Sequence, residues 1–184
     1  MIRIAKRIIV AAALIILPFF LVTGAGTGAR ADDLAEYQVK AAFLYNFAKF
    51  VEWPERAFSG PDAPMTICVI GDDLFGPALD GLRSKTVKNR KVVVKRVSGP
   101  GEIGGCHVLF ISPADDDRMD EILLSLKGHS TLVVGDTERF VRRGGMIGFL
   151  MERNRVVFEI NENSAKRAGL QISSQLLKLA RTVY

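Results

Sequence analysis

Four short apolar segments constrain the fold of this chain more than any other feature of its sequence. Each is rich in apolar or β-branched residues and is too short for a typical helix. They read MTICVIGDD, RKVVVKRV, CHVLFIS and STLVVGD. Helix-like segments, LFGPALDGLRSK and DDDRMDEILLSLKG, separate the first from the second and the third from the fourth. Strands that alternate with helices in this way predict an α/β fold with a largely parallel sheet.

Further elements are predicted on the C-terminal side. GGMIGFLM and RVVFEI predict a hairpin across ERN, and Asn161 opens a last predicted helix. One face of that helix carries Ala165, Ala168, Ile172, Leu176, Leu179 and Val183. The sequence therefore predicts a single α/β domain, with a mostly parallel sheet flanked by helices and a hairpin near the C-terminal side.

Aromatic residues concentrate in KAAFLYNFAKFVEWP, near the start of the chain. At helical spacing, four apolar side chains share one face: Val39, Phe43, Phe47 and Phe50. This pattern predicts an amphipathic helix from Asp33 to about Trp53, ended by Pro54. Core packing explains such a stripe better than a cofactor site does. Tyr45 and Trp53 lie off the stripe and are not explained by it.

The first 31 residues have the layout of a secretory signal peptide. A basic start precedes a mostly apolar run, and small residues then end in the A-x-A sequence of Ala29, Arg30 and Ala31. An uncleaved membrane anchor is the alternative, but the apolar run is shorter than the ~20 residues that a span needs, and Pro18 interrupts it. We therefore expect cleavage near Ala31 and a mature domain over residues 32–184.

Net charge gives no reason to expect nucleic acid as a partner. Residues 1–31 contain four of the 25 Lys and Arg and none of the 20 Asp and Glu, so the mature chain has a net charge of about +1. One basic cluster remains in the mature chain: Lys85, Lys88, Arg90, Lys91, Lys95 and Arg96. It fits either attraction to an acidic partner or a sheet-edge strand whose lysines discourage further pairing.

The two cysteines, Cys68 and Cys106, both follow the predicted cleavage site. An even pair in an exported chain favours a disulfide, since neither residue belongs to a C-x-x-C motif or a zinc-ligand cluster. Two buried thiols are the alternative.

Candidate chemistry is sparse. Ligands of open α/β sheets lie beyond the carboxyl ends of strands, and the predicted rim there consists of Gly71-Asp72-Asp73, Ser112-Pro113 and Gly135-Asp136-Thr137. Asp72 and Asp73 suit a cation or acid-base catalysis, but a turn followed by a helix cap is the more ordinary role. His107 beside Cys106 suggests thiol catalysis, yet a packed histidine is the simpler interpretation. We predict no catalytic residue, no metal site, no cofactor and no enzymatic activity.

An ordered set of segments resembles the YfiR family of small exported bacterial proteins. The matching segments are VKAAFLYNFAKFVEWP, ICVIGDDLFG, CHVLFIS, GGMIGF, FEIN and AGLQISSQLLKLARTV, and they span nearly the whole mature chain. The resemblance implies a periplasmic repressor. Such a protein binds the periplasmic region of an inner-membrane diguanylate cyclase and keeps cyclic-di-GMP and biofilm formation low. It further implies an outer-membrane lipoprotein that sequesters the repressor.

By position, Cys68 and Cys106 match the structural disulfide of that family. Some members carry a second cysteine pair in the region that matches Val141 to Phe149, and this chain has none there. The chain therefore lacks the cysteines that redox control through a second pair would need.

The predicted hairpin offers the best candidate for partner binding. Its polar tip is flanked by apolar residues, and we assign the contact to Phe149, Met151, Arg153 and Arg155. A solvated loop with two ordinary arginines is the alternative. The alternative function is a periplasmic small-ligand-binding module that uses the strand-end rim. The sequence leaves the oligomeric state open, a homodimer included.

Overall fold

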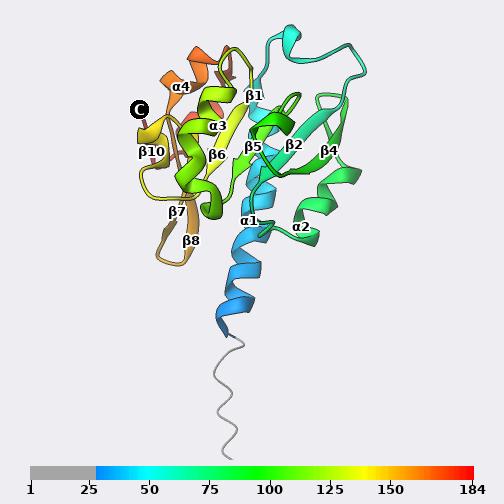
Figure 1. The fold of residues 1–184 in the computed structure, drawn as a ribbon. Coiled ribbons are helices and arrows are strands. Elements are labelled where there is room, and N and C mark those ends of the chain that lie inside the picture. Colours follow the sequence, from blue (N-terminus) through cyan, green and yellow to red (C-terminus); the bar gives the residue numbers. More distant parts are fainter. Residues whose placement is uncertain (1–27) are drawn as a thin grey trace, which may run out of the picture.

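The computed structural model describes the backbone of residues 28–184 and the side chains from Asp33 onward. A sheet of eight strands, ordered β10-β8-β7-β6-β5-β2-β4-β3, forms the centre, and a separate pair joins β1 to β9 (Figure 1). The central strands are β2 (Met65–Ile70), β4 (Arg90–Val97), β5 (Val108–Ile111), β6 (Leu132–Gly135), β7 (Ile147–Glu152) and β8 (Arg155–Ile160). The short strands are β1 (Val51–Glu52), β3 (Thr86–Val87), β9 (Gln171–Ile172) and β10 (Thr182–Val183).

Strand directions confirm the predicted fold class. β2 runs parallel to β4 and β5, and the parallel pairing continues through β6 to β7. Only β7 with β8 and β3 with β4 pair antiparallel in this sheet. Every residue of β2, β5 and β6 is buried, which is why these strands are continuous apolar runs in the sequence. β3 pairs only with Arg90 and Lys91, so most of β4 is an edge, as the basic cluster suggested.

Helices cover both faces of the sheet. The α-helices are α1 (Gly28–Phe50), α2 (Pro77–Asp80), α3 (Met119–Ser125), α4 (Glu162–Arg167) and α5 (Ser174–Leu179). Short 3-10 helices occur at Glu55–Ala57, Gly81–Ser84, Pro100–Glu102, Pro113–Arg118 and Phe140–Arg143. α1 and α3 lie on opposite faces (Figure 1).

The long helix α1 carries the aromatic stripe into the core. Phe47 is fully buried and its ring lies 5.6 Å from that of Phe149 and 5.1 Å from that of Phe158. The predicted end of the helix is wrong, because α1 stops at Phe50 and Val51 pairs with Ile172 of β9. Tertiary pairing thus ends the helix before Pro54 does.

The predicted last helix is also wrong, because it is two short helices with β9 between them. α4 ends before Gly169, whose φ of +76° lies in the left-handed region that favours glycine. Ile172 then pairs with Val51. The apolar pattern of the sequence continues across Gly169, so the pattern alone did not show that the helix ends there.

The predicted signal peptide lies largely outside the described residues. Its expected cleavage position, near Ala31, falls in the first turns of α1. Within residues 28–184, no helix has the length and apolar character needed to cross a membrane.

Candidate functional site

α1 covers the strand-end rim predicted as a ligand site at the end of β6, while Asp72 of the same rim stays exposed. The Asp136 side chain, just after β6, is 4% exposed, and its Oδ2 lies 2.6 Å from Nζ of the equally buried Lys40. The Tyr37 hydroxyl donates to the same oxygen at 2.7 Å. Burial and the neighbouring Asp136 carboxylate raise the pKa of Tyr37 far above its usual value. These contacts join α1 to the sheet and cover the end of β6, although Oδ1 of Asp136 is buried without a hydrogen-bond partner among the described residues.

Two other rim residues have structural partners, whereas the buried Ser112 hydroxyl has no hydrogen-bond partner among the described residues. Asp73 Oδ1 accepts hydrogen bonds from the backbone N–H groups of Phe75 and Gly76, both at 3.1 Å, and its Oδ2 pairs with Arg96. Thr137 donates to Asp116 at 2.6 Å. Within the described part of the chain, no group of three or more His, Cys, Asp or Glu side chains could hold a metal ion. Asp73 therefore acts as a cap.

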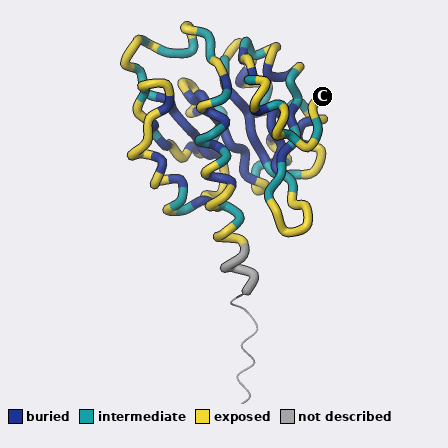
Figure 2. The backbone as a smooth tube through the Cα atoms, turned by 180° about the vertical axis from the view of Figure 1, so that it is seen from behind, coloured by how far each residue is buried: buried dark blue, intermediate teal, exposed yellow. Residues whose placement is uncertain are grey.

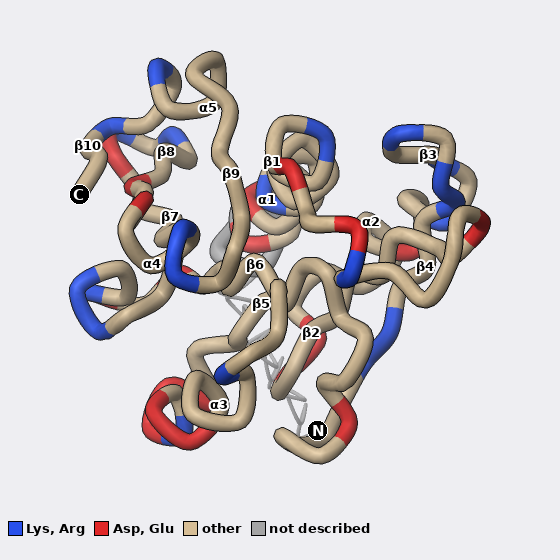
Figure 3. The backbone as a smooth tube through the Cα atoms, turned by 90° about the horizontal axis from the view of Figure 1, so that it is seen from above, with Lys and Arg blue, Asp and Glu red and all other residues tan. Residues whose placement is uncertain are grey.

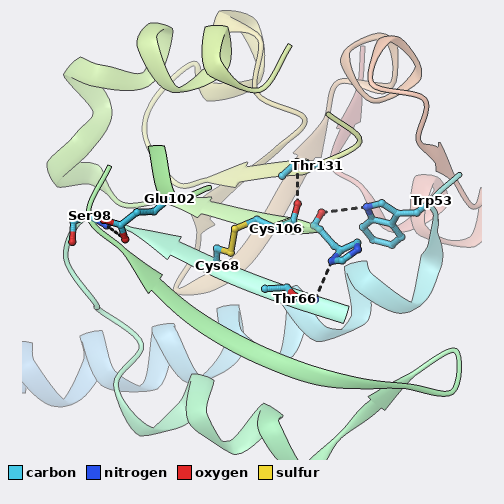
Figure 4. The surroundings of a disulfide bond; sticks show 8 residues. Trp53, Thr66, Cys68, Ser98, Glu102, Cys106 and Thr131 are labelled. Carbon is cyan, nitrogen blue, oxygen red and sulfur yellow. Dashed lines mark hydrogen bonds between the residues drawn. A yellow bond between two sulfur atoms is a disulfide. The ribbon is translucent and has the colours of Figure 1, made fainter. Parts of the chain in front are cut away.

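The predicted disulfide is present. Cys68 of β2 is bonded to Cys106, just before β5, with their Cα atoms 5.8 Å apart (Figure 4). The bond joins the middle of β2 to the segment that leads into the neighbouring strand β5.

His107 is a packed histidine, and its surroundings explain Trp53. Its Nδ1 accepts a hydrogen bond from the Thr66 N–H, so Nε2 carries the proton and donates to the Ala57 carbonyl at 3.1 Å. The ring stacks on Phe58 at 4.3 Å. The Trp53 indole donates to the His107 carbonyl (Figure 4). Burial lowers the pKa of His107, the Ala57 hydrogen bond partly opposes this, and the positive charge of Arg90 adds to the lowering. Thiol catalysis is excluded, because Cys106 is bridged.

The hairpin tip presents three of the four predicted contact residues at the surface. Phe149 is 1% exposed and packs on Phe47, so it supports the tip from within and is not available as a contact. Met151 is 46% exposed. Arg153 and Arg155 are exposed, and neither forms an ion pair with any residue in 33–184.

A groove that the sequence did not predict lies beside this tip. It has a volume of about 400 Å³ and is lined from α1 by Glu36, Val39 and Phe43 and from the hairpin by Met151, Arg155 and Val156. Val39 was expected in the core, yet it is 45% exposed, while Lys40 and Ala41 in the same turn are buried. Figure 2 shows the start of α1 extending beyond the rest of the fold. The groove therefore has an apolar floor, with the basic Arg155 and the acidic Glu36 at its edge.

The tip residues Arg153 and Asn154 have φ angles of 47° and 62°. Two successive positive φ values define a type I′ turn, in which Asn and Gly are favoured and Arg is not. The β3–β4 hairpin repeats this geometry with Lys88 and Asn89. There, however, the Lys88 ammonium donates to the Val51 carbonyl and pairs with Glu52. Arg153 has no equivalent ion-pair partner among the described residues.

Comparison with known proteins adds a family match and a likeness of fold. A family model described as YfiR/HmsC-like matches residues 37–181. Two solved structures are similar in fold, and each has about 60% of its length covered by this chain. One, a conserved domain protein from Vibrio cholerae, is 11% identical with a TM-score of 0.55 over 80% of this chain. The other, the ABC domain from Streptococcus pneumonia in complex with L-Trp, is 12% identical with a TM-score of 0.53 over 81%.

Proposed function

Because the chain belongs to the YfiR/HmsC-like family, we propose that it is a periplasmic regulatory protein that represses an inner-membrane diguanylate cyclase. It binds the periplasmic region of the cyclase and holds the enzyme inactive, which keeps cyclic-di-GMP and biofilm formation low. An outer-membrane lipoprotein relieves the repression by sequestering the repressor. In this proposal the protein acts by binding and catalyses no reaction.

Export is part of the proposal. The basic, apolar and small-residue order of residues 1–31 supports a cleaved signal peptide. Mass spectrometry of periplasmic protein should find an N-terminus near Asp32, and an intact Met1 in a membrane fraction would contradict export by cleavage.

The observation that carries the binding proposal is the exposed cation at the hairpin tip. Arg153 occupies a left-handed turn position that disfavours it, and it makes no ion pair within residues 33–184. Unfavourable backbone positions of this kind persist where the side chain serves a purpose. Lys88, in the same position of the other hairpin, serves the fold through Val51 and Glu52. We assign the purpose of Arg153 to an external partner.

The groove beside the tip supplies the apolar part of the interface. Met151 and Val39 are both exposed at its edges, and Phe43 lies in its floor. Interfaces commonly combine an apolar centre with arginine at the side. A segment of the cyclase with apolar side chains and a nearby carboxylate fits this surface.

The test replaces the charges at the tip. Arg153→Glu with Arg155→Glu should leave stability within ~0.5 kcal/mol of the parent, since surface changes seldom cost more, while releasing the cyclase and raising cyclic-di-GMP. The matched control is Lys91→Glu with Lys95→Glu, which makes the same change in charge on the exposed residues of β4. The measurements are cellular cyclic-di-GMP and pull-down of the periplasmic region of the cyclase.

If the folded tip variant binds and represses as the parent does, the interface lies elsewhere. Tyr45 and Trp53 would be tested next, although both rings already have hydrogen-bond partners, the carbonyls of Thr86 and His107.

A further inference from the structure

Two adjoining hollows lie at the amino-terminal edge of the parallel strands, opposite to the strand-end rim. Their volumes are about 380 and 140 Å³, and both are lined by Gly128, His129 and Thr131. These three residues connect α3 to β6. The two hollows therefore adjoin at this segment, and together they are called the amino-edge cleft.

The larger hollow is apolar inside and basic at its rim. Its apolar lining includes Leu123, Val133, Met146 and Ala168, and Lys127 and Arg167 also line it. A volume of this size lies in the range of small-molecule sites, which are mostly apolar with a few placed polar groups.

The smaller hollow is polar. It is lined by Arg56, His129 and Ser130 together with Gly105 and Cys106. A Cβ placed on Gly169 would lie 2.9 Å from Nη2 of Arg56 and 3.6 Å from Oγ of Ser130, so both side chains converge there. The guanidinium thus lies next to a hydroxyl, an arrangement that suits a carboxylate or phosphate.

The cations of this cleft have no acidic partners. Neither hollow is lined by an Asp or Glu, and none of Arg56, Lys127 and Arg167 forms a salt bridge within residues 33–184. Figure 3 shows Lys and Arg positions on separate segments around β5 and β6, near α3 and α4. A cleft lined by one sign of charge concentrates ions of the opposite sign.

We infer that this cleft binds a small organic anion with an apolar body. The anionic group lies in the smaller hollow against Arg56, His129 and Ser130. The apolar body fills the larger hollow over Leu123, Val133 and Met146. Lys127 and Arg167 add long-range attraction. A medium-chain fatty acid has both parts.

The test uses decanoate as the probe, with the mature full-length chain and calorimetry. Decanoate should bind saturably and lose affinity as salt is raised. Hexanoate should bind at least about tenfold more weakly, because fewer methylenes are buried, and neutral decanol should do so because it lacks the charge. Inorganic phosphate alone should compete only weakly.

Two variants locate the site. Arg56→Gln and Arg167→Gln should each weaken decanoate binding by at least about fivefold. The control is Lys166→Gln, which removes a neighbouring exposed cation that pairs with Glu162 and lines neither hollow. Absence of saturable decanoate binding, equal binding of decanol, or equal effects of Arg56→Gln and Lys166→Gln would each overturn the inference.

This test is independent of the proposed function. It uses purified protein without the cyclase, and none of its variants touches the hairpin tip. Loss of decanoate binding with intact repression, or the reverse, separates the two proposals.

Discussion

The two edges of the central sheet use the same kinds of side chain in different ways. At the carboxyl edge, Lys40 is buried against Asp136, and Arg96 bridges Asp73 and Asp80. At the amino edge, Arg56 and Arg167 have no carboxylate partner among residues 33–184. A polar residue at a strand end can therefore hold two elements of the fold together, and its residue type alone does not identify a ligand site.

The path of the chain explains the difference. α1 crosses the carboxyl edge and brings Lys40 and Tyr37 to the end of β6. No long helix crosses the amino edge, which is held by the Cys68–Cys106 bond and the hydrogen bonds of His107. Space for a ligand remains at the amino edge, where local contacts rather than a long helix hold the strands together.

The largest effect is expected from breaking the carboxyl edge. Lys40→Met leaves the Asp136 carboxylate buried without its cation, and removal of one partner of a buried ion pair costs about 3–5 kcal/mol. Urea unfolding measures this loss. Lys49→Met, on an exposed position of the same helix, should stay within ~0.5 kcal/mol of the parent.

A second variant separates charge from packing. Adding Asp136→Leu to Lys40→Met removes the stranded charge and should recover most of the stability. If Lys40→Met alone is as stable as the parent, the ion pair does not hold α1, and the contrast between the edges fails.

The second largest loss of stability is expected from removal of the disulfide at the amino edge. Cys68→Ala or Cys106→Ala should each lower the free energy of unfolding by about 2–4 kcal/mol, because the bond closes a loop between residues 38 apart in sequence. The double variant should be no worse than either single one, since one bond is lost in every case. Labelling of free thiols at both positions in the native protein would contradict the bond.

The central strands could be predicted because neighbouring residues of each strand are buried together, so each strand is an apolar run in the sequence. All six residues of β2 are buried and all are apolar or Thr. β1, β9 and β10 have two residues each, so no local pattern marks them; they exist through pairing with distant segments. The strand order likewise depends on contacts that no short stretch of sequence contains.

The candidate sites were predictable in part. Phe149 and Met151 lie two residues apart and share a face of β7, yet Phe149 meets Phe47 in the core while Met151 reaches the groove beside Val39. Whether a residue on this face is buried or exposed depends on how far α1 extends over the hairpin, and no local sequence pattern predicts that extent. The amino-edge cleft draws its cations from residues 56, 127 and 167, which no motif connects.

The smallest effect is a pH dependence that the amino edge should show as pH falls below 6.5. Both histidines, His107 and His129, lie at this edge. Burial holds the pKa of His107 below its ordinary value of 6.5, so the folded state resists a proton that the unfolded chain accepts. Stability from this group is complete above pH 6.5 and declines as pH falls below it, by at most about 1.4 kcal/mol per pH unit, until the folded pKa is reached.

Protonation also removes the hydrogen bond at the amino edge, because protonated Nδ1 can no longer accept from the Thr66 N–H. The protection factor of the Thr66 amide against hydrogen exchange should therefore fall in acid, while amides of α1 near Lys40 respond only through global unfolding. His107→Gln should flatten the stability profile below pH 6.5. An unchanged profile in His107→Gln, or a loss of protection in acid that appears first at Lys40, would show that the two edges do not differ in the way their contacts indicate.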